Sequence, residues 1–270
     1  MQKSALLACG VLPATGGDLR EILERLGGGL RLSTQVEGVP MGSGLGTSSI
    51  LAGACVKAVY GMMDVEASDE MVFDRVLCLE QIMSTGGGWQ DQVGGATDGI
   101  KLITSKAGWK QKIHVQKLSI RPEVLAELSA RFALIYTGQR RLARNLLRDI
   151  VGKYLGNDPQ ALSALEEIKQ IAVKMSAALE KGDIDVFARL LDRHWILSNR
   201  LDAGSSNTCI DYIFLAIDDL IDGKMICGAG GGGFLQVILK KGVTREALKK
   251  RLADVFGDCG VSVWESEIYT

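Results

Sequence analysis

The stretch PMGSGLGTSS at residues 40–49 decides the fold, because it places a glycine-rich turn between two segments of different periodicity. Before it, residues 31–36 (RLSTQV) alternate polar and apolar side chains, which predicts a strand. After it, residues 50–60 form a mostly apolar run that is long enough for a buried helix. Glycines let backbone N–H groups approach an anion, and a helix N-terminus adds unpaired donors and a favourable dipole. The stretch predicts a phosphate-binding loop. The alternative, which involves no ligand, is a flexible turn with a Ser/Thr helix cap.

The overall composition narrows the class of protein. The chain has 270 residues, is 47% hydrophobic and carries a net charge of −1, which suits one large domain or two lobes. Near-neutral charge argues against nucleic acid or an anionic membrane as a partner. No apolar run reaches the roughly 18 residues of a membrane helix. The six cysteines are scattered without zinc-ligand spacing, so buried free thiols in a reducing cytoplasm are expected.

The periodicity of the remaining sequence predicts mainly helices in the N-terminal part of the chain and helices packed on a sheet in the C-terminal part. The expected helices begin near residues 2, 18, 50 and 68, then fill most of 140–220 as three or four helices, and return at 244–256. The expected later strands are 100–104, 113–118, 133–136, 224–227, 234–239 and 261–268. The predicted fold class is α+β, with an N-terminal α/β lobe over residues 1–137 and a C-terminal lobe of helices on a small antiparallel sheet over residues 138–270.

Three features supply what phosphoryl transfer needs, besides the loop at 40–49. Asp91 lies in a second glycine-rich loop, residues 85–95, and is a candidate general base. Glu80 lies near the end of an apolar-faced helix and could hold magnesium together with Ser48, since this ion takes one or two protein oxygens plus phosphate and water. Residues 228–233 (GAGGGG) form a third glycine-rich turn. Each feature also fits a structural role: a turn aspartate, a solvated glutamate or a tight crossover between strands.

Together these motifs resemble those of the GHMP small-molecule kinases. Residues 40–49 are similar to the second motif of that family and residues 224–234 to the third, whereas the lysine of the P-loop pattern is absent. Further similarity, to the kinase domain of the L-fucokinases, runs from about residue 6 to residue 268 and is clearest at residues 42–53, 79–81, 85–95 and 136–147 (YTGQRRLARNLL). The related heptose-phosphate kinases share the glycine loops and the Trp-Gln-Asp-Gln, but usually diverge after Tyr-Thr-Gly.

The resemblance implies ATP and Mg²⁺ as cofactors and a small sugar as the substrate. It implies that the nucleotide contacts are Gly42, Ser43, Gly44, Leu45, Gly46, Thr47, Ser48, Ser49, Gly228, Gly230 and Gly231. It implies that Ser48 and Glu80 bind the metal and that Asp91 faces the anomeric hydroxyl of the sugar. The candidate sugar contacts are Gly87, Gly88, Asp91, Tyr136, Arg141 and Arg144. A solvated basic face, shared with neighbouring arginines, explains Arg141 and Arg144 equally well.

One part of the family pattern is missing. No segment upstream of Pro40 matches the first motif, Arg-x-Asp-x-x-Gly-Gly-x-x-Asp, in the right place. The guanylyltransferase-type region that many fucokinases carry is also absent. The sequence therefore predicts a kinase domain without its first strands, whose uncovered sheet edge would pair with a second copy.

Three functions follow. The first is transfer of the γ-phosphate of ATP to the anomeric hydroxyl of L-fucose, which gives fucose 1-phosphate. The second is phosphorylation of a heptose phosphate by the same machinery. The third is a nucleotide- or sugar-binding homologue that no longer catalyses, because the first motif is missing. All three are expected to be cytoplasmic and to act without nucleic acid or membrane partners.

Overall fold

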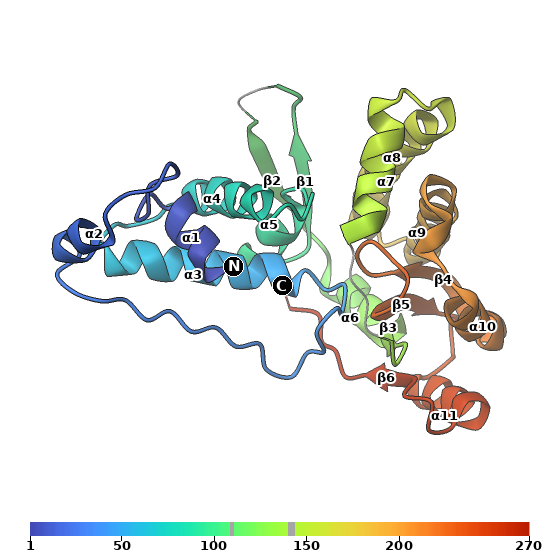
Figure 1. Ribbon diagram of the computed structural model, residues 1–270. Helices are drawn as coiled ribbons and strands as arrows, with labels where there is room; N and C mark the ends of the chain where they lie inside the picture. Colours follow the sequence, from blue (N-terminus) through green and yellow to red (C-terminus); the bar gives the residue numbers. More distant parts are fainter. Residues whose placement is uncertain (109–110, 140–143, 270) are drawn as a thin grey trace. The chain divides into compact units, whose positions relative to one another are not determined.

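The computed structural model describes residues 1–108, 111–139 and 144–269, without the side chains of residues 144–146. Within this part the chain is an α+β protein of helices and two antiparallel sheets, which confirms the predicted class (Figure 1). Packing divides it into two compact units, Met1–Val39 with Gly46–Thr97 and Pro40–Leu45 with Asp98–Thr270. This division lies before the lobe boundary predicted at residue 137. That boundary refers to the lobes of the kinase fold and stays a prediction.

Helices around one apolar core make up the first unit. They are α1 (Gln2–Ala8), α2 (Leu19–Arg25), α3 (Thr47–Met62), α4 (Asp69–Ile82) and α5 (Gln90–Ala96). The side chains of Asp18 and Ser68 cap α2 and α4 by accepting hydrogen bonds from backbone N–H groups of the first turn. The core gathers fully buried side chains of α3 and α4, among them Ala52, Val56 and Leu79. Both helices are therefore fixed along the faces that the apolar pattern predicts.

Two segments of this unit differ from the prediction. Residues 31–36 form no strand within the part of the chain that the structure describes, because alternation builds a strand only where a partner completes the ladder. Residues 90–96, which were expected to be part of a loop, form the short helix α5. Its glycines allow close packing, since a Cβ on Gly95 would collide with the side chain of Ile50. Pairing of an uncovered edge with a second copy stays a prediction.

Both sheets belong to the second unit. Strands β1 (Lys101–Ser105) and β2 (Ile113–Lys117) form an antiparallel hairpin. The larger sheet has the order β4-β5-β3-β6, built from β3 (Phe132–Tyr136), β4 (Ile221–Ile226), β5 (Phe234–Leu239) and β6 (Ser262–Trp264). The strands predicted in this part of the chain are confirmed, although β4 begins earlier and β6 is shorter than expected.

The helices of the second unit are α6 (Pro122–Arg131), α7 (Arg144–Leu155), α8 (Pro159–Lys181), α9 (Ile184–Leu201), α10 (Thr208–Ala216) and α11 (Arg245–Phe256), with short 3₁₀ turns η1 (Ala203–Ser205) and η2 (Asp218–Leu220). Only α6 was not expected. It starts with Pro122 at its first position, where the missing N–H costs nothing.

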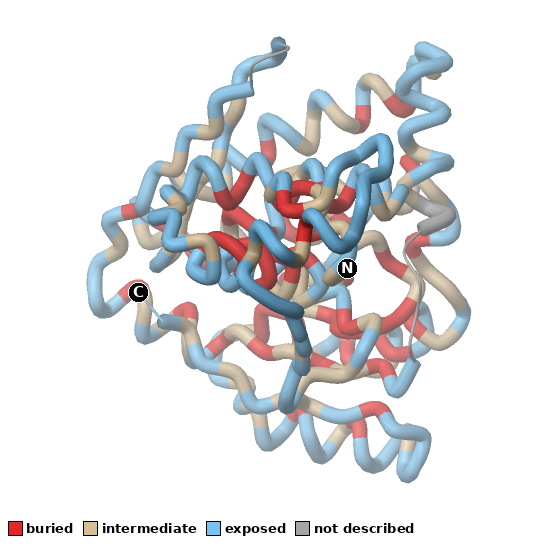
Figure 2. The backbone as a smooth tube through the Cα atoms, turned by 60° about the vertical axis from the view of Figure 1, so that its left-hand side comes forward, coloured by how far each residue is buried: buried red, intermediate tan, exposed pale blue. Residues whose placement is uncertain are grey.

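The main core of the second unit lies against the four-stranded sheet. It contains Ile135 of β3, Leu235 of β5, Ile210 of α10 and Leu248 of α11, all fully buried. Buried positions alternate with exposed ones along the helices, as amphipathic packing requires (Figure 2). No helix in the described part of the chain is both long and apolar enough to cross a membrane. The six cysteines are free thiols, but Cys78 and Cys259 are exposed, so the prediction that these thiols are buried is wrong for these two.

Candidate active site

The first half of the predicted phosphate loop belongs to the second unit, where the start of β5 holds it. The backbone N–H of Phe234 donates to the carbonyl oxygen of Ser43 at 3.0 Å. Ser43 is fully buried, and its Oγ accepts a hydrogen bond from the N–H of Leu45 at 3.2 Å. The turn that precedes α3 is therefore held by backbone and side-chain hydrogen bonds.

Glycine is required where this loop meets the third glycine-rich turn. Gly44 and Gly228 both adopt left-handed backbone, with φ of +78° and +72°. A Cβ on Gly228 would lie 3.0 Å from the Cα of Gly44, and a Cβ on Gly44 would collide with the carbonyl of Cys227. The structure thus brings two of the predicted nucleotide residues, Gly44 and Gly228, together.

Gly230 and Gly231 lie elsewhere in the same turn and contact the segment after α9. A Cβ on Gly230 would lie 2.5 Å from the carbonyl oxygen of Ser205. The N–H of Gly231 donates to that same oxygen at 2.8 Å. The side-chain amide of Asn207 donates to the carbonyl of Gly231 at 3.1 Å and to Gln139 Oε1 at 3.2 Å. Ser205 and Asn207 are missing from the predicted site, because nothing in their sequence surroundings distinguishes them from an ordinary helix start.

The second half of the phosphate loop opens α3 in the first unit. Gly46 caps the helix in the left-handed conformation with φ of +69°. Its Cα lies against the carboxyl of Asp91: a Cβ there would stand 3.1 Å from Asp91 Cγ. Asp91 in turn occupies the first turn of α5. The predicted general base and the start of the phosphate-facing helix are therefore adjacent.

Glu80 lies near the end of α4 and is buried, with 7% of its surface exposed. Its Oε1 accepts a hydrogen bond from the Oγ of Ser49. Its main-chain carbonyl accepts bonds from the N–H and the Oγ1 of Thr85, each at 3.1 Å. A Cβ on Gly87 would lie 2.5 Å from Glu80 Oε2. Ser48, the hydroxyl predicted to share the metal with Glu80, is exposed in the first turn of α3.

The charge of Asp91 acts on Glu80. Burial raises the pKa of Glu80, the hydrogen bond from Ser49 lowers it, and the charge of Asp91 raises it further. Burial also raises the pKa of Asp91. Asp91 as a whole is an exposed residue, although neighbouring atoms surround its carboxyl closely enough to raise the pKa of that group. Two repelling carboxylates are stabilised by a nearby cation.

Glu80 and Ser48 carry oxygen atoms of the kind that magnesium takes as ligands. Within residues 1–108, 111–139 and 144–269, no group of three or more His, Cys, Asp or Glu side chains could hold a metal alone. Mg²⁺ does not require such a cage, because it keeps waters and takes one or two carboxylates plus phosphate oxygens. Glu80 with a hydroxyl of α3 supplies oxygen ligands of this kind.

The structure describes the positions of some of the remaining predicted sugar contacts but not of all of them. Tyr136 ends β3 and packs against Phe234 and Trp264, with ring centroids 5.2 and 6.0 Å away. Gly87 and Gly88 lie between α4 and α5. Arg141 lies outside the described residues. Arg144 begins α7, but its side chain is not among those described.

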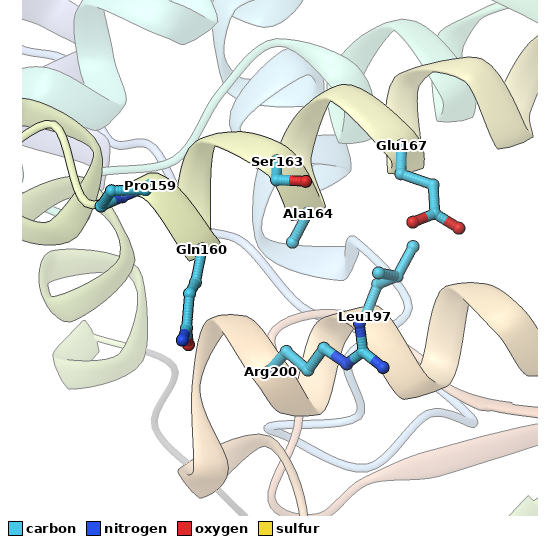
Figure 3. A pocket seen from close by; sticks show the side chains of 7 residues that line it. All are labelled: Pro159, Gln160, Ser163, Ala164, Glu167, Leu197 and Arg200. Atoms are coloured by element: carbon cyan, nitrogen blue, oxygen red, sulfur yellow. The ribbon is translucent and has the colours of Figure 1, made fainter.

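A pocket of about 470 Å³ in the second unit lies between α8 and α9 and shares no residue with these motifs (Figure 3). Its lining is Pro159, Gln160, Ser163, Ala164, Glu167, Leu197 and Arg200. Glu167 is already paired with Arg193, at 2.6 and 2.8 Å. This pocket is formed where two helices pack, and none of the predicted catalytic, nucleotide or metal residues lines it.

Comparison with known proteins places these motifs in a family context. The family model "GHMP kinases N terminal domain" matches residues 16–99. The bifunctional fucokinase/GDP-fucose pyrophosphorylase of Arabidopsis thaliana is 36% identical over 252 residues, which cover 93% of this chain and 23% of that protein. The D-glycero-alpha-D-manno-heptose 7-phosphate kinase of Campylobacter jejuni is 31% identical over 199 residues, which cover 73% of this chain and 58% of that protein. The chain thus spans less than two thirds of either relative.

The fold has counterparts among solved structures. The phosphomevalonate kinase of Streptococcus pneumoniae, solved with phosphomevalonate and AMPPNP, superposes with a TM-score of 0.70 at 17% identity. The superposition covers 98% of this chain and 80% of that one. The resemblance predicted from the sequence is therefore confirmed: residues 16–99 match the N-terminal domain of the GHMP kinases, and the chain has the fold of that family.

Proposed function

We propose that the chain is an ATP-dependent sugar kinase that transfers the γ-phosphate of ATP to the anomeric hydroxyl of L-fucose. The observation that carries this proposal is the contact of the Asp91 carboxyl with Gly46 at the start of α3. It puts a base beside the helix start that offers N–H donors to phosphate. The fucokinase relative, similar over 93% of this chain, supports L-fucose as the sugar.

In this proposal the phosphate groups bind to backbone N–H groups of residues 42–49, and the exposed hydroxyl of Ser48 with Glu80 holds Mg²⁺. The ion would neutralise charge on the transferring phosphoryl group. Gly228 supports the loop through its contact with Gly44. Gly230 and Gly231 would support nucleotide binding indirectly, through the Ser205 segment that they contact.

Asp91 would accept the proton of the sugar hydroxyl while the hydroxyl oxygen attacks the γ-phosphorus, whose bond to the bridging oxygen breaks to release ADP. Burial raises the pKa of this carboxyl. A base whose pKa lies closer to the working pH takes the proton more effectively, as long as it stays ionised. The proposed sugar contacts are still Gly87, Gly88, Tyr136, Arg141 and Arg144. The same proposal includes a cytoplasmic location and ATP as the phosphate donor.

A coupled assay of ADP release with ATP, Mg²⁺ and a panel of sugars tests this function. Release with L-fucose, but not with D-galactose or a heptose 7-phosphate, is the expected result. Asp91→Asn should lower kcat by about 10²- to 10⁴-fold and keep ATP affinity. The matched control is Glu66→Gln, which removes an exposed carboxylate from the same unit. Normal turnover by Asp91→Asn would show that Asp91 is not the base.

A heptose phosphate is the second candidate substrate, because the heptose 7-phosphate kinase relative is 31% identical over 73% of this chain. Preferential turnover of a heptose 7-phosphate in the same panel would favour it. Binding of ATP and a sugar without turnover would instead favour the non-catalytic homologue.

A further inference from the structure

The first turn of α3 presents two neighbouring hydroxyl groups in different environments. Ser48 is exposed, whereas Ser49 is 5% exposed. Successive residues of a helix point about 100° apart, so one hydroxyl cannot take the place of the other. Ser49 Oγ donates to Glu80 Oε1 and thereby links the first turn of α3 to the end of α4.

Glu80 is restrained at both its main chain and its side chain. Thr85 bonds its carbonyl twice, and the backbone of Gly87 lies so close to Oε2 that no side chain would fit between them. In the part of the chain that the structure describes, Ser49 provides the one side-chain hydrogen bond to the carboxylate, and it uses Oε1. Oε2 therefore keeps its lone pairs available.

We propose that Ser49 is a positioning residue, whose hydroxyl fixes Oε1 of Glu80 so that Oε2 is presented to the divalent cation. This inference rests on the proposed metal role of Glu80 and Ser48. A group that orients a metal ligand typically changes metal affinity by about 10- to 100-fold when it is removed. If the Ser49 hydroxyl only satisfies a buried carboxylate, its removal changes stability and leaves metal affinity alone.

Isothermal titration with the non-hydrolysable ATP analogue AMP-PNP separates these roles. The dissociation constant is measured once with Mn²⁺ and once with EDTA, so that the ratio reports the contribution of the metal. Ser49→Ala should weaken binding with Mn²⁺ by at least tenfold and leave binding in EDTA within a factor of two. Ser49→Thr keeps a hydroxyl and should restore the ratio to within about threefold of the unaltered protein.

Ser68→Ala is the control for lost stability, because it removes the N-cap of the same helix α4 far from its C-terminal end. It should lower Tm without changing the ratio. If Ser49→Ala does not unfold cooperatively, Ser49→Cys replaces it, since the thiol has a similar shape and is a weaker donor. The ratio for Ser49→Cys should lie between those of Ser49→Ala and the unaltered protein.

Failure of this inference can be told apart from failure of the proposed function. If Mn²⁺ no longer strengthens AMP-PNP binding to Glu80→Gln but still strengthens binding to Ser49→Ala and Ser49→Cys, the positioning role of Ser49 is wrong and the metal role of Glu80 stands. If Mn²⁺ also strengthens AMP-PNP binding to Glu80→Gln, the metal role of Glu80 and the positioning role of Ser49 are both wrong. If the Mn²⁺ results are as expected and no sugar is phosphorylated, the sugar assignment fails and the positioning role of Ser49 stands.

Discussion

Gly46 and Asp91 are in contact: a Cβ on Gly46 would lie 3.1 Å from both Cβ and Cγ of Asp91 and 3.5 Å from Oδ1. Gly46 is also the N-cap of α3, with φ of +69°. The left-handed backbone favours glycine at this position, and a methyl group there would also press on the side chain of Asp91. The loop geometry and the placement of the proposed base are thereby coupled.

Replacing Gly46 by alanine should consequently affect both stability and turnover. The left-handed backbone alone costs a non-glycine residue about 1–2 kcal/mol, and the added methyl group would displace Asp91. We expect kcat to fall more than ATP affinity. Gly61→Ala is the control, because Gly61 lies in the last turn of the same helix with nothing within 4 Å of its Cβ position. Urea unfolding and steady-state kinetics measure the two effects. Unchanged kcat in Gly46→Ala would contradict the coupling.

Asp91 should determine the acidic limb of the pH profile of kcat/KM. Burial raises the pKa of Asp91 above its ordinary value of 3.8, so protonation removes the base at a higher pH than for a free aspartate. Activity should fall as the pH decreases through this raised pKa. The residual activity of Asp91→Asn should lack that limb, and Glu66→Gln should retain it. A limb that persists in Asp91→Asn would assign it to another group.

The local structure around the phosphate loop followed from the sequence because it depends on neighbouring residues. The caps at Asp18 and Ser68 and the glycine turn between β4 and β5 each use chemistry within a few residues. Helix α3 was expected from residue 50 but begins at Thr47, inside the predicted loop. The adjacency of Gly46 and Asp91 was not predicted, since the resemblance to a family implied only a separate role for each residue. Periodicity contains no information on which loops meet.

Long-range partners account for what the sequence did not predict. The alternation in residues 31–36 could not reveal whether a neighbouring strand exists, and α5 depends on the packing of Gly95 against Ile50. The hydrogen bonds of Asn207 to Gln139 and Gly231 join residues distant in sequence. Ser49 was predicted as a phosphate contact, whereas in the structure its hydroxyl points to Glu80. Only the packing of α3 on α4 distinguishes it from Ser48.

The stability of the metal-free protein should depend on pH through Glu80. Burial, and then the charge of Asp91, raise the pKa of this carboxyl above 4.5, so the folded state binds the proton more tightly than the unfolded chain. Stability gained by protonation is therefore present at low pH and is lost as the pH rises from 4.5 through the raised pKa. Glu80→Gln should unfold with a smaller pH dependence and be at least as stable at pH 7. Urea unfolding at pH 4.5 and pH 7 checks this. Equal pH dependence in both proteins would contradict it.

Contact between the glycine turns should be visible as a difference between two glycine-to-alanine substitutions. Gly228 and Gly242 both have left-handed φ, +72° and +83°. A Cβ on Gly228 would lie 3.0 Å from both the Cα and the carbonyl oxygen of Gly44, whereas a Cβ on Gly242 would meet nothing within 4 Å. Both variants incur the backbone cost of about 1–2 kcal/mol.

Only Gly228→Ala should additionally displace the phosphate loop. We expect it to weaken AMP-PNP binding by at least tenfold and to unfold at lower urea concentration than Gly242→Ala. Gly242→Ala should bind AMP-PNP like the unaltered protein, since its methyl group faces open space. Isothermal titration in EDTA isolates the loop from the metal, because the nucleotide then contacts the protein without Mn²⁺. Equal AMP-PNP affinity in the two variants would show that the third glycine-rich turn does not shape the phosphate loop.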